Sequence, residues 1–213
     1  LSYVEFLRHI FAFNSESPLL FTQFYFWAFF AIVYTVFAFI MEVGTNTRLH
    51  LRNIFLMAVS WFFYYKTSGL FLLILLFVTL SDWLIAKRIY SCVNRSSNNG
   101  KRKAKWWLAL SIVIDLGLLC YFKYAYFFTN VFNNLFGTEI AVFDIFAYIG
   151  NGFSDSGRFM VDRIILPVGI SFYIFQVISY TVDVYRGHVK PVNNILDFGF
   201  YVSFFPQLVA GPI

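Results

Sequence analysis

Long apolar runs alternate with short polar segments along this chain, which is the pattern of helices that cross a lipid bilayer. The runs that predict membrane-spanning helices lie near 19–43, 53–65, 70–86, 106–122 and 166–186. The second and third runs flank a polar turn and fit a helical hairpin. The last segment, 197–213, contains two prolines that interrupt helical hydrogen bonding, so it is predicted to be broken or re-entrant. Residues 1–18 mix apolar and charged side chains and fit a helix lying at the membrane interface.

Composition strengthens this picture. The chain has 213 residues, of which 60% are hydrophobic and only 13% are charged, whereas soluble domains have roughly 25% charged residues. The 30 Phe, 14 Tyr and 5 Trp supply bulk for helix packing and amphipathic rings for the membrane interfaces. We therefore expect an all-α, polytopic integral membrane protein whose main partner is the lipid bilayer.

The net charge of +5 is concentrated in one connecting segment. Seven of the sixteen Lys and Arg lie within 87–105, and basic segments between spans mark the cytoplasmic side of a membrane. We expect this loop to be cytoplasmic and, counting the spans backwards, the N-terminus to lie outside. Topology thus explains the charge, and no nucleic-acid partner is expected.

The run at 166–186 carries a regular line of polar groups. Gly169, Tyr173, Gln176, Tyr180, Asp183 and Gly187 recur at spacings of three and four, which places them on one face of a helix. The opposite face is Ile, Phe and Val. Such a helix would turn its polar face towards a protein interior or a water-filled cavity, so we interpret it as the wall of a site within the membrane.

Other reactive side chains are scattered. Asp115 lies in the middle of a predicted span, and an acid at that depth needs a partner, a proton or a cavity. Lys123 and Arg163 are both candidate partners, and a structural pair, a proton relay and a substrate ligand stay open. The two cysteines, Cys92 and Cys120, lie in different environments and suggest no disulfide, and the three histidines have no metal-ligand spacing.

Two segments carry a family resemblance: LPVGISFYIFQVISYTVDVYRG at 166–187 and DFGFYVSFFPQLVAGPI at 197–213. Together they resemble the membrane-bound O-acyltransferase family, in particular its bacterial alginate O-acetyltransferase branch and, more distantly, the D-alanine exporter of teichoic acid modification. Earlier apolar segments, RNIFLMAVSWFFYYKTSGLFLLILLFVTLSDWLIA among them, resemble the opening helices of the family. The resemblance extends over almost the whole chain.

This resemblance implies a helical bundle in the bacterial inner membrane, with 1–213 forming the N-terminal part of a single membrane domain. The implied enzyme takes an acyl group, most simply acetyl, from acetyl-CoA or another acyl carrier on the cytoplasmic side and delivers it towards an exported polysaccharide. An extracytoplasmic acetyltransferase is the implied partner, and no bound cofactor is expected. The catalytic histidine of the family lies beyond Ile213, so none of His9, His50 and His188 is assigned to catalysis, and the chain alone is expected to be inactive.

Given the resemblance, we interpret the polar line as part of the wall of a candidate substrate tunnel. The residues expected to line it are Tyr173, Gln176, Ser179, Tyr180, Asp183, Pro206 and Gln207. For each of them the competing interpretation is interhelical hydrogen bonding, because Ser, Gln and Tyr also join membrane helices without touching a substrate.

Two other functions stay open. Polar faces, a mid-span acid and broken helices also describe secondary transporters, although the chain shows no internal repeat. A non-catalytic membrane scaffold for an extracytoplasmic transferase is the third reading. A membrane-embedded histidine downstream would favour the enzyme, and an inverted copy of the first half would favour the transporter.

Overall fold

A computed structural model describes residues 24–42, 45–94, 98–146, 148 and 164–210. Within these residues the chain forms helices and no strand, which confirms the all-α prediction. The predicted interfacial segment 1–18 lies outside them. The chain divides into two compact units, one made of Leu1–Ile112 with Val168–Ile213 and the other of Val113–Pro167. Each unit is described by itself.

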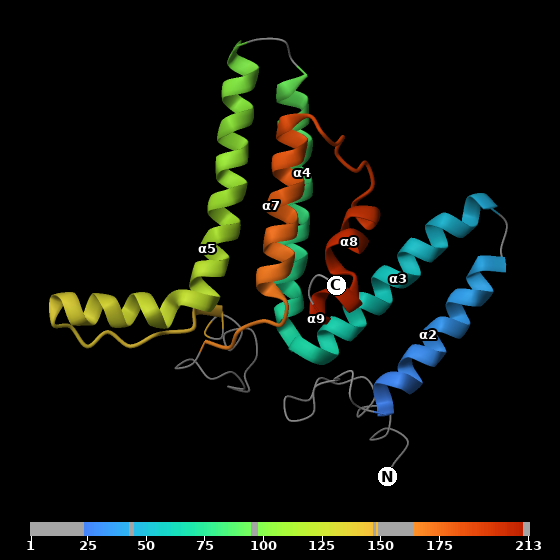
Figure 1. Ribbon diagram of the computed structural model, residues 1–213, viewed down its shortest axis with the longest axis horizontal. Coiled ribbons are helices and arrows are strands. Elements are labelled where there is room, and N and C mark those ends of the chain that lie inside the picture. Colours follow the sequence, from blue (N-terminus) through green and yellow to red (C-terminus); the bar gives the residue numbers. More distant parts are fainter. Residues whose placement is uncertain (1–23, 43–44, 95–97, 147, 149–163, 211–213) are drawn as a thin grey trace. The chain divides into compact units, whose positions relative to one another are not determined.

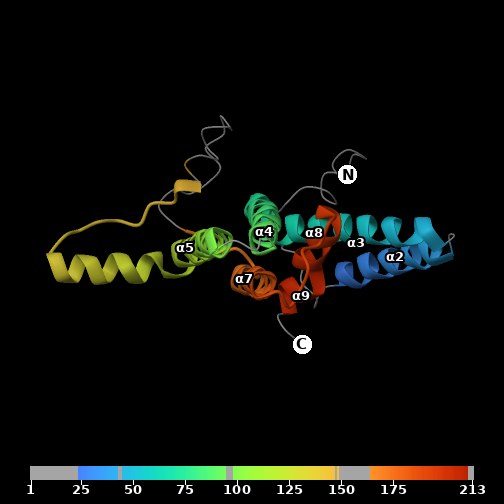
Figure 2. The same cartoon turned by 90° about the horizontal axis from the view of Figure 1, so that it is seen from above.

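The first unit holds most of the helices. They are α2 (Phe24–Glu42), α3 (Thr45–Ser68), the short 3-10 helix η1 (Gly69–Phe71), α4 (Leu72–Val93), the start of α5 (Asn98–Phe136), α7 (Ile170–Arg186), α8 (Ile195–Ser203) and α9 (Phe205–Ala210). α2 lies beside α3, and α7 lies beside α4, in both views (Figure 1, Figure 2). α8 contacts α3 and α4, so the last described helices pack back onto the first ones.

The predicted turn between the second and third apolar runs is the place where α3 and α4 meet. Only η1 separates them, and Gly69 at its start has a φ of 61°, a conformation that glycine adopts without steric cost. Downstream, α8 and α9 meet at Phe204, directly before the short helix that contains Pro206. Asn194 precedes α8 as its N-cap, and its side chain accepts a hydrogen bond from the Leu196 backbone N–H at 3.1 Å.

Aromatic rings hold the helices of this unit together. Phe63 of α3 is fully buried and contacts Phe26 and Phe29 of α2 and Phe205 of α9. Its ring centroid lies 5.2 Å from that of Phe205. These four rings, which we call the phenylalanine cluster, join helices that are far apart in the sequence.

The basic segment 87–105 differs from the expected loop because most of it is helical. α4 continues to Val93 and α5 begins at Asn98. Lys and Arg are good helix formers, so a basic sequence extends a helix beyond its apolar part. α5 has 39 residues, which corresponds to about 58 Å measured along the helix axis, whereas the hydrocarbon core of a bilayer is about 30 Å thick.

In the described part of the chain, two helical stretches are by length and composition apolar enough to cross a membrane, Leu51–Val93 and Asn99–Phe136, and Phe26–Met41 is a shorter apolar helix. Large apolar side chains point outward from these helices, for example Leu73 and Val113, which are 63% and 68% exposed. Such surfaces suit lipid or further helices rather than water.

The second unit is organised by side chains of α5. The Tyr121 hydroxyl accepts a hydrogen bond from the Ile145 N–H at 2.8 Å and donates to the Asp144 carboxylate at 3.2 Å. The Asn133 side chain forms hydrogen bonds with both the N–H and the carbonyl of Ile140. These two bonds hold the segment after α5 against the helix. Asp115 is fully buried, and Arg163, one of its two predicted partners, lies outside the described residues.

Candidate functional site

α7 is held at its start by a close approach to α9. Gly169 precedes the helix with a φ of 71°, and a Cβ on this residue would overlap the carbonyl oxygen of Leu208. The preceding residue is fixed as well, because the buried Tyr64 hydroxyl donates to the Val168 carbonyl at 3.0 Å. α7 therefore begins at a position set by both α3 and α9.

The buried face of α7 is not the predicted polar face but lies next to it. The buried residues are Ile170, Tyr173, Ile174, Val177, Tyr180, Thr181 and Val184, and the contacts of α7 are mainly with α4. Only Tyr173 and Tyr180 belong to both sets. The polar line thus runs along the border between the buried face and the open face of the helix.

The two tyrosines of the polar line contact protein. Tyr173 is fully buried, and its hydroxyl interacts with that of Tyr64. Tyr180 packs on Phe198 with ring centroids 4.8 Å apart, and its hydroxyl accepts a hydrogen bond from the Val192 N–H at 2.9 Å. In this unit both side chains join helices and loops, as interhelical polar groups do.

Gln176 joins α7 to α8 and faces an open groove. Its Nε2 donates to the Tyr201 carbonyl at 2.9 Å, whereas its Oε1 is buried and has no hydrogen-bond partner among the described residues. The groove has a volume of about 700 Å³ and is lined by Ser171, Phe172, Phe175, Gln176, Ser179, Tyr201 and Gln207. Three predicted tunnel residues, Gln176, Ser179 and Gln207, therefore share one hollow.

Asp183 and Pro206 lie elsewhere. Asp183 is near the end of α7, where its Oδ1 is 3.6 Å from His188 Nδ1, and its side chain is 40% exposed. Gly187, with a φ of 77°, and His188 cap the helix through backbone hydrogen bonds to Val184 and Asp183. Pro206 is half-buried in α9 and does not line the groove.

Four lining residues of the groove were not predicted: Ser171, Phe172, Phe175 and Tyr201. Phe172, Phe175 and Ser179 follow each other at spacings of three and four, so helical periodicity places them on one face. Because this face is mainly aromatic, the sequence pattern assigns it to lipid or packing. Tyr201 lies on another helix, and no local pattern connects it to α7.

The chemistry of the groove is that of binding rather than of proton transfer. Its lining offers two amides, two serine hydroxyls and three aromatic rings. The buried Gln176 Oε1 is available to accept a hydrogen bond from a ligand hydroxyl, and the aromatic rings are available to pack against an apolar face of the same ligand. Neither His nor a carboxylate is among the lining residues, and in the described part of the chain no cluster of three or more His, Cys, Asp and Glu side chains forms a metal site.

Thiol labelling tests which face of α7 is open. In a variant with Cys92 and Cys120 replaced by Ser, cysteines at Gln176 and Ser179 are expected to react with a small water-soluble thiol reagent. A cysteine at Val177, which is fully buried, is the matched control and is expected to stay unreacted. Labelling would be read by mass spectrometry of the folded protein, and equal rates at all three positions would contradict the groove.

Comparison with known proteins shows which proteins have a sequence similar to that of this chain. The chain is 37% identical over 165 residues to a probable alginate O-acetylase of Pseudomonas aeruginosa, covering 76% of this chain and 27% of that protein. It is 37% identical over 165 residues to the corresponding protein of Azotobacter vinelandii, covering 76% and 28%. A peptidoglycan O-acetyltransferase of Helicobacter pylori is 26% identical over 185 residues, covering 76% and 30%.

No family model and no solved structure matches the chain. The chain spans between a quarter and a third of the length of the relatives cited here. Each of these similarities extends over about three quarters of the chain. The resemblance seen in the sequence is therefore confirmed: the chain is a membrane protein that is similar to the bacterial alginate O-acetylases over 76% of its length.

Proposed function

We propose that the intact protein is a membrane-bound O-acyltransferase that transfers acetyl groups towards hydroxyls of an exported or cell-surface polysaccharide. The observation that carries this proposal is the similarity to proteins named alginate O-acetylase and peptidoglycan O-acetyltransferase. Both names describe the acetylation of a glycan hydroxyl. The acceptor of this protein is accordingly a polysaccharide, and its donor is acetyl-CoA or another acyl carrier.

In the proposed acyl transfer, the residues of the groove would bind and orient the substrate. A sugar hydroxyl attacks the acyl carbonyl carbon, the carrier leaves, and the proton of the hydroxyl passes to a general base. The groove has donors and acceptors that hold a hydroxyl or a carbonyl, among them Gln176, Ser179 and Gln207. The base is, by the resemblance, a histidine outside residues 1–213. The groove residues would thus orient the substrate, and their effect would be on binding and positioning.

Topology completes the proposal. With segment 87–105 cytoplasmic and the N-terminus outside, the donor reaches the protein from the cytoplasm of a bacterial inner membrane. The polysaccharide acceptor lies on the other side of the membrane, together with the implied partner, an extracytoplasmic acetyltransferase. An acyl group therefore has to cross the membrane through this protein.

Complementation of a deletion strain tests the function. We expect the strain without the gene to export a polymer that lacks O-acetyl groups, and the wild-type gene to restore them. Gln176→Leu removes the hydrogen bond to Tyr201 and the free amide oxygen, so acetylation per sugar should fall roughly tenfold. The matched control is Leu73→Ala, at an exposed apolar position on α4, which should restore acetylation fully.

The amount of exported polymer must be measured beside its acetyl content. Unchanged acetylation in the deletion strain would contradict the transferase. A loss of exported polymer with normal acetylation per sugar would instead favour the transporter.

A further inference from the structure

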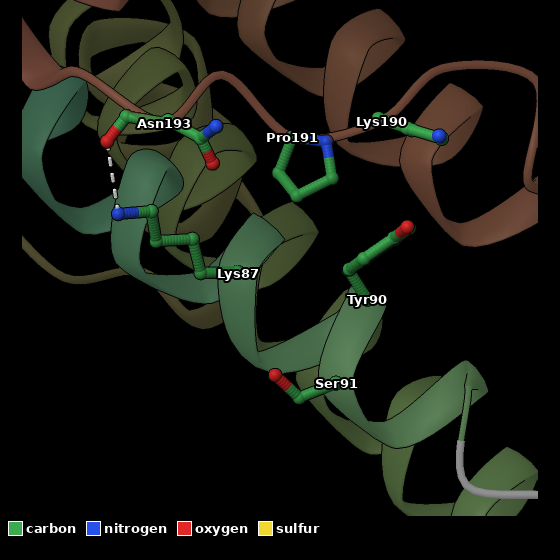
Figure 3. A pocket seen from close by; sticks show the side chains of 6 residues that line it. All are labelled: Lys87, Tyr90, Ser91, Lys190, Pro191 and Asn193. Atoms are coloured by element: carbon green, nitrogen blue, oxygen red, sulfur yellow. Dashed lines mark hydrogen bonds between the residues drawn. The ribbon is translucent and has the colours of Figure 1, made fainter.

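A second hollow lies where the last turns of α4 meet the connection from α7 to α8. It has a volume of about 360 Å³ and is lined by Lys87, Tyr90, Ser91, Lys190, Pro191 and Asn193 (Figure 3). The first three residues belong to α4 and the others to the connection. We call it the lysine pocket. It shares no lining residue with the groove on α7.

The wall formed by the connection is fixed by three hydrogen bonds. The Trp83 Nε1–H donates to the Val192 carbonyl at 2.9 Å, and the Val192 N–H donates to the Tyr180 hydroxyl at 2.9 Å. The Lys87 Nζ donates to the Asn193 carbonyl at 3.0 Å, as Figure 3 shows. The pocket is therefore present before any ligand binds, which lowers the entropy cost of binding.

The charge of the pocket is not neutralised from within. Lys87 lies over the Trp83 ring, with Nζ 3.7 Å from its centroid, and its hydrogen bond to Asn193 uses one of three donors. Lys190 is exposed. Neither lysine forms a salt bridge among the described residues, and no carboxylate lines the pocket. The two ammonium groups, which point towards opposite ends of the pocket in Figure 3, and the hydroxyls of Tyr90 and Ser91 leave donors for an anion.

The position of the pocket narrows the kind of anion. It lies at the end of the apolar stretch Leu51–Val93, which is where a helix leaves the hydrocarbon and meets the polar headgroups. Hydroxyl donors between two cations fit the several oxygens of a phosphate group better than those of a single carboxylate. We propose that the lysine pocket binds a phosphate group, carried either by an anionic phospholipid or by a soluble phosphate compound.

The test uses the intact protein purified in detergent and two probes. Retention of phosphatidylglycerol, measured by native mass spectrometry against phosphatidylcholine, reports the lipid source. Saturable binding of inorganic pyrophosphate, measured by calorimetry, reports the soluble source. Lys87→Gln and Lys190→Gln are expected to weaken binding of the preferred probe roughly tenfold each, the loss of one charge-assisted contact. Arg88→Gln, an exposed neighbour outside the pocket, is the matched control and should leave binding unchanged.

The two probes distinguish a lipid site from a site for a soluble phosphate compound. Loss of phosphatidylglycerol retention in both lysine variants identifies a lipid site, and loss of pyrophosphate binding identifies a soluble ligand. Lys190 donates no hydrogen bond within the described residues, so Lys190→Gln leaves the fold intact and is the decisive variant. Binding of neither probe, binding that Lys190→Gln does not change, or an equal loss in Arg88→Gln would each overturn the proposal.

Discussion

Replacement of Gly169 by Ala is expected to destabilise the protein by about 2–5 kcal/mol. Two costs add. A side chain at a φ of 71° costs about 1–2 kcal/mol, and the new methyl group overlaps the Leu208 carbonyl, which forces α7 and α9 apart at a further cost of about 1–3 kcal/mol. Thermal unfolding of the purified protein measures the loss.

Two other glycines separate these costs. Gly187 also has a positive φ, 77°, but a Cβ there meets no atom within 4 Å, so Gly187→Ala should show only the conformational cost. Gly117 has neither feature, and Gly117→Ala should be neutral or stabilise helix α5 by up to about 1 kcal/mol. If Gly169→Ala were no more harmful than Gly187→Ala, the close approach of α7 to α9 would be excluded.

Replacement of Phe63 by Ala is the second large expected effect. The side chain is fully buried in the phenylalanine cluster and touches rings of α2 and α9. Truncation leaves a cavity that neighbouring helices cannot close without moving, so we expect a loss of about 3–5 kcal/mol. Lipid does not change this expectation, because packing contacts rather than exclusion of water join helices within a membrane.

The matched control for Phe63 is Phe77 on α4, which has the same side chain but is 54% exposed. Phe77→Ala removes no tightly packed ring, and its effect should stay below about 1 kcal/mol. Both variants would be compared by unfolding in the same detergent. Equal losses at the two positions would mean that the cluster is not the tightly packed centre of this unit.

Much of the helical framework could be predicted from apolar runs alone, since each run is long enough to require a helix. Helix ends were harder to predict. The polar and basic residues around Lys87 and Lys105 looked like a loop, yet α4 and α5 extend through them. An apolar run marks the part of a helix that lies within the bilayer and does not mark the ends of the helix. Good helix formers such as Lys and Arg continue the helix beyond the bilayer into water.

The candidate site could also be predicted only in part from the sequence. Spacing placed Tyr173, Gln176 and Tyr180 on one face of α7, and the helix is observed there. Spacing could not tell which neighbour each side chain meets. Tyr180 meets Val192 and Phe198, whereas Gln176 meets Tyr201 beside an open groove. These partners come from a different segment of the chain, so the border between packing and groove is decided by tertiary structure.

The hydrogen bonds between α3 and later segments of the chain can form only after those segments have been synthesised. Tyr64 meets Val168 after 104 further residues, and Ser60 meets the Phe205 N–H after 145. At a synthesis rate of about 5–20 residues per second, α3 waits roughly 5 to 30 s for its partners. Ser60 bridges this interval through its hydrogen bond to the Leu56 carbonyl within α3. The Tyr64 hydroxyl likewise interacts with Ser68 of the same helix, so both side chains have a neighbour within α3 during this interval.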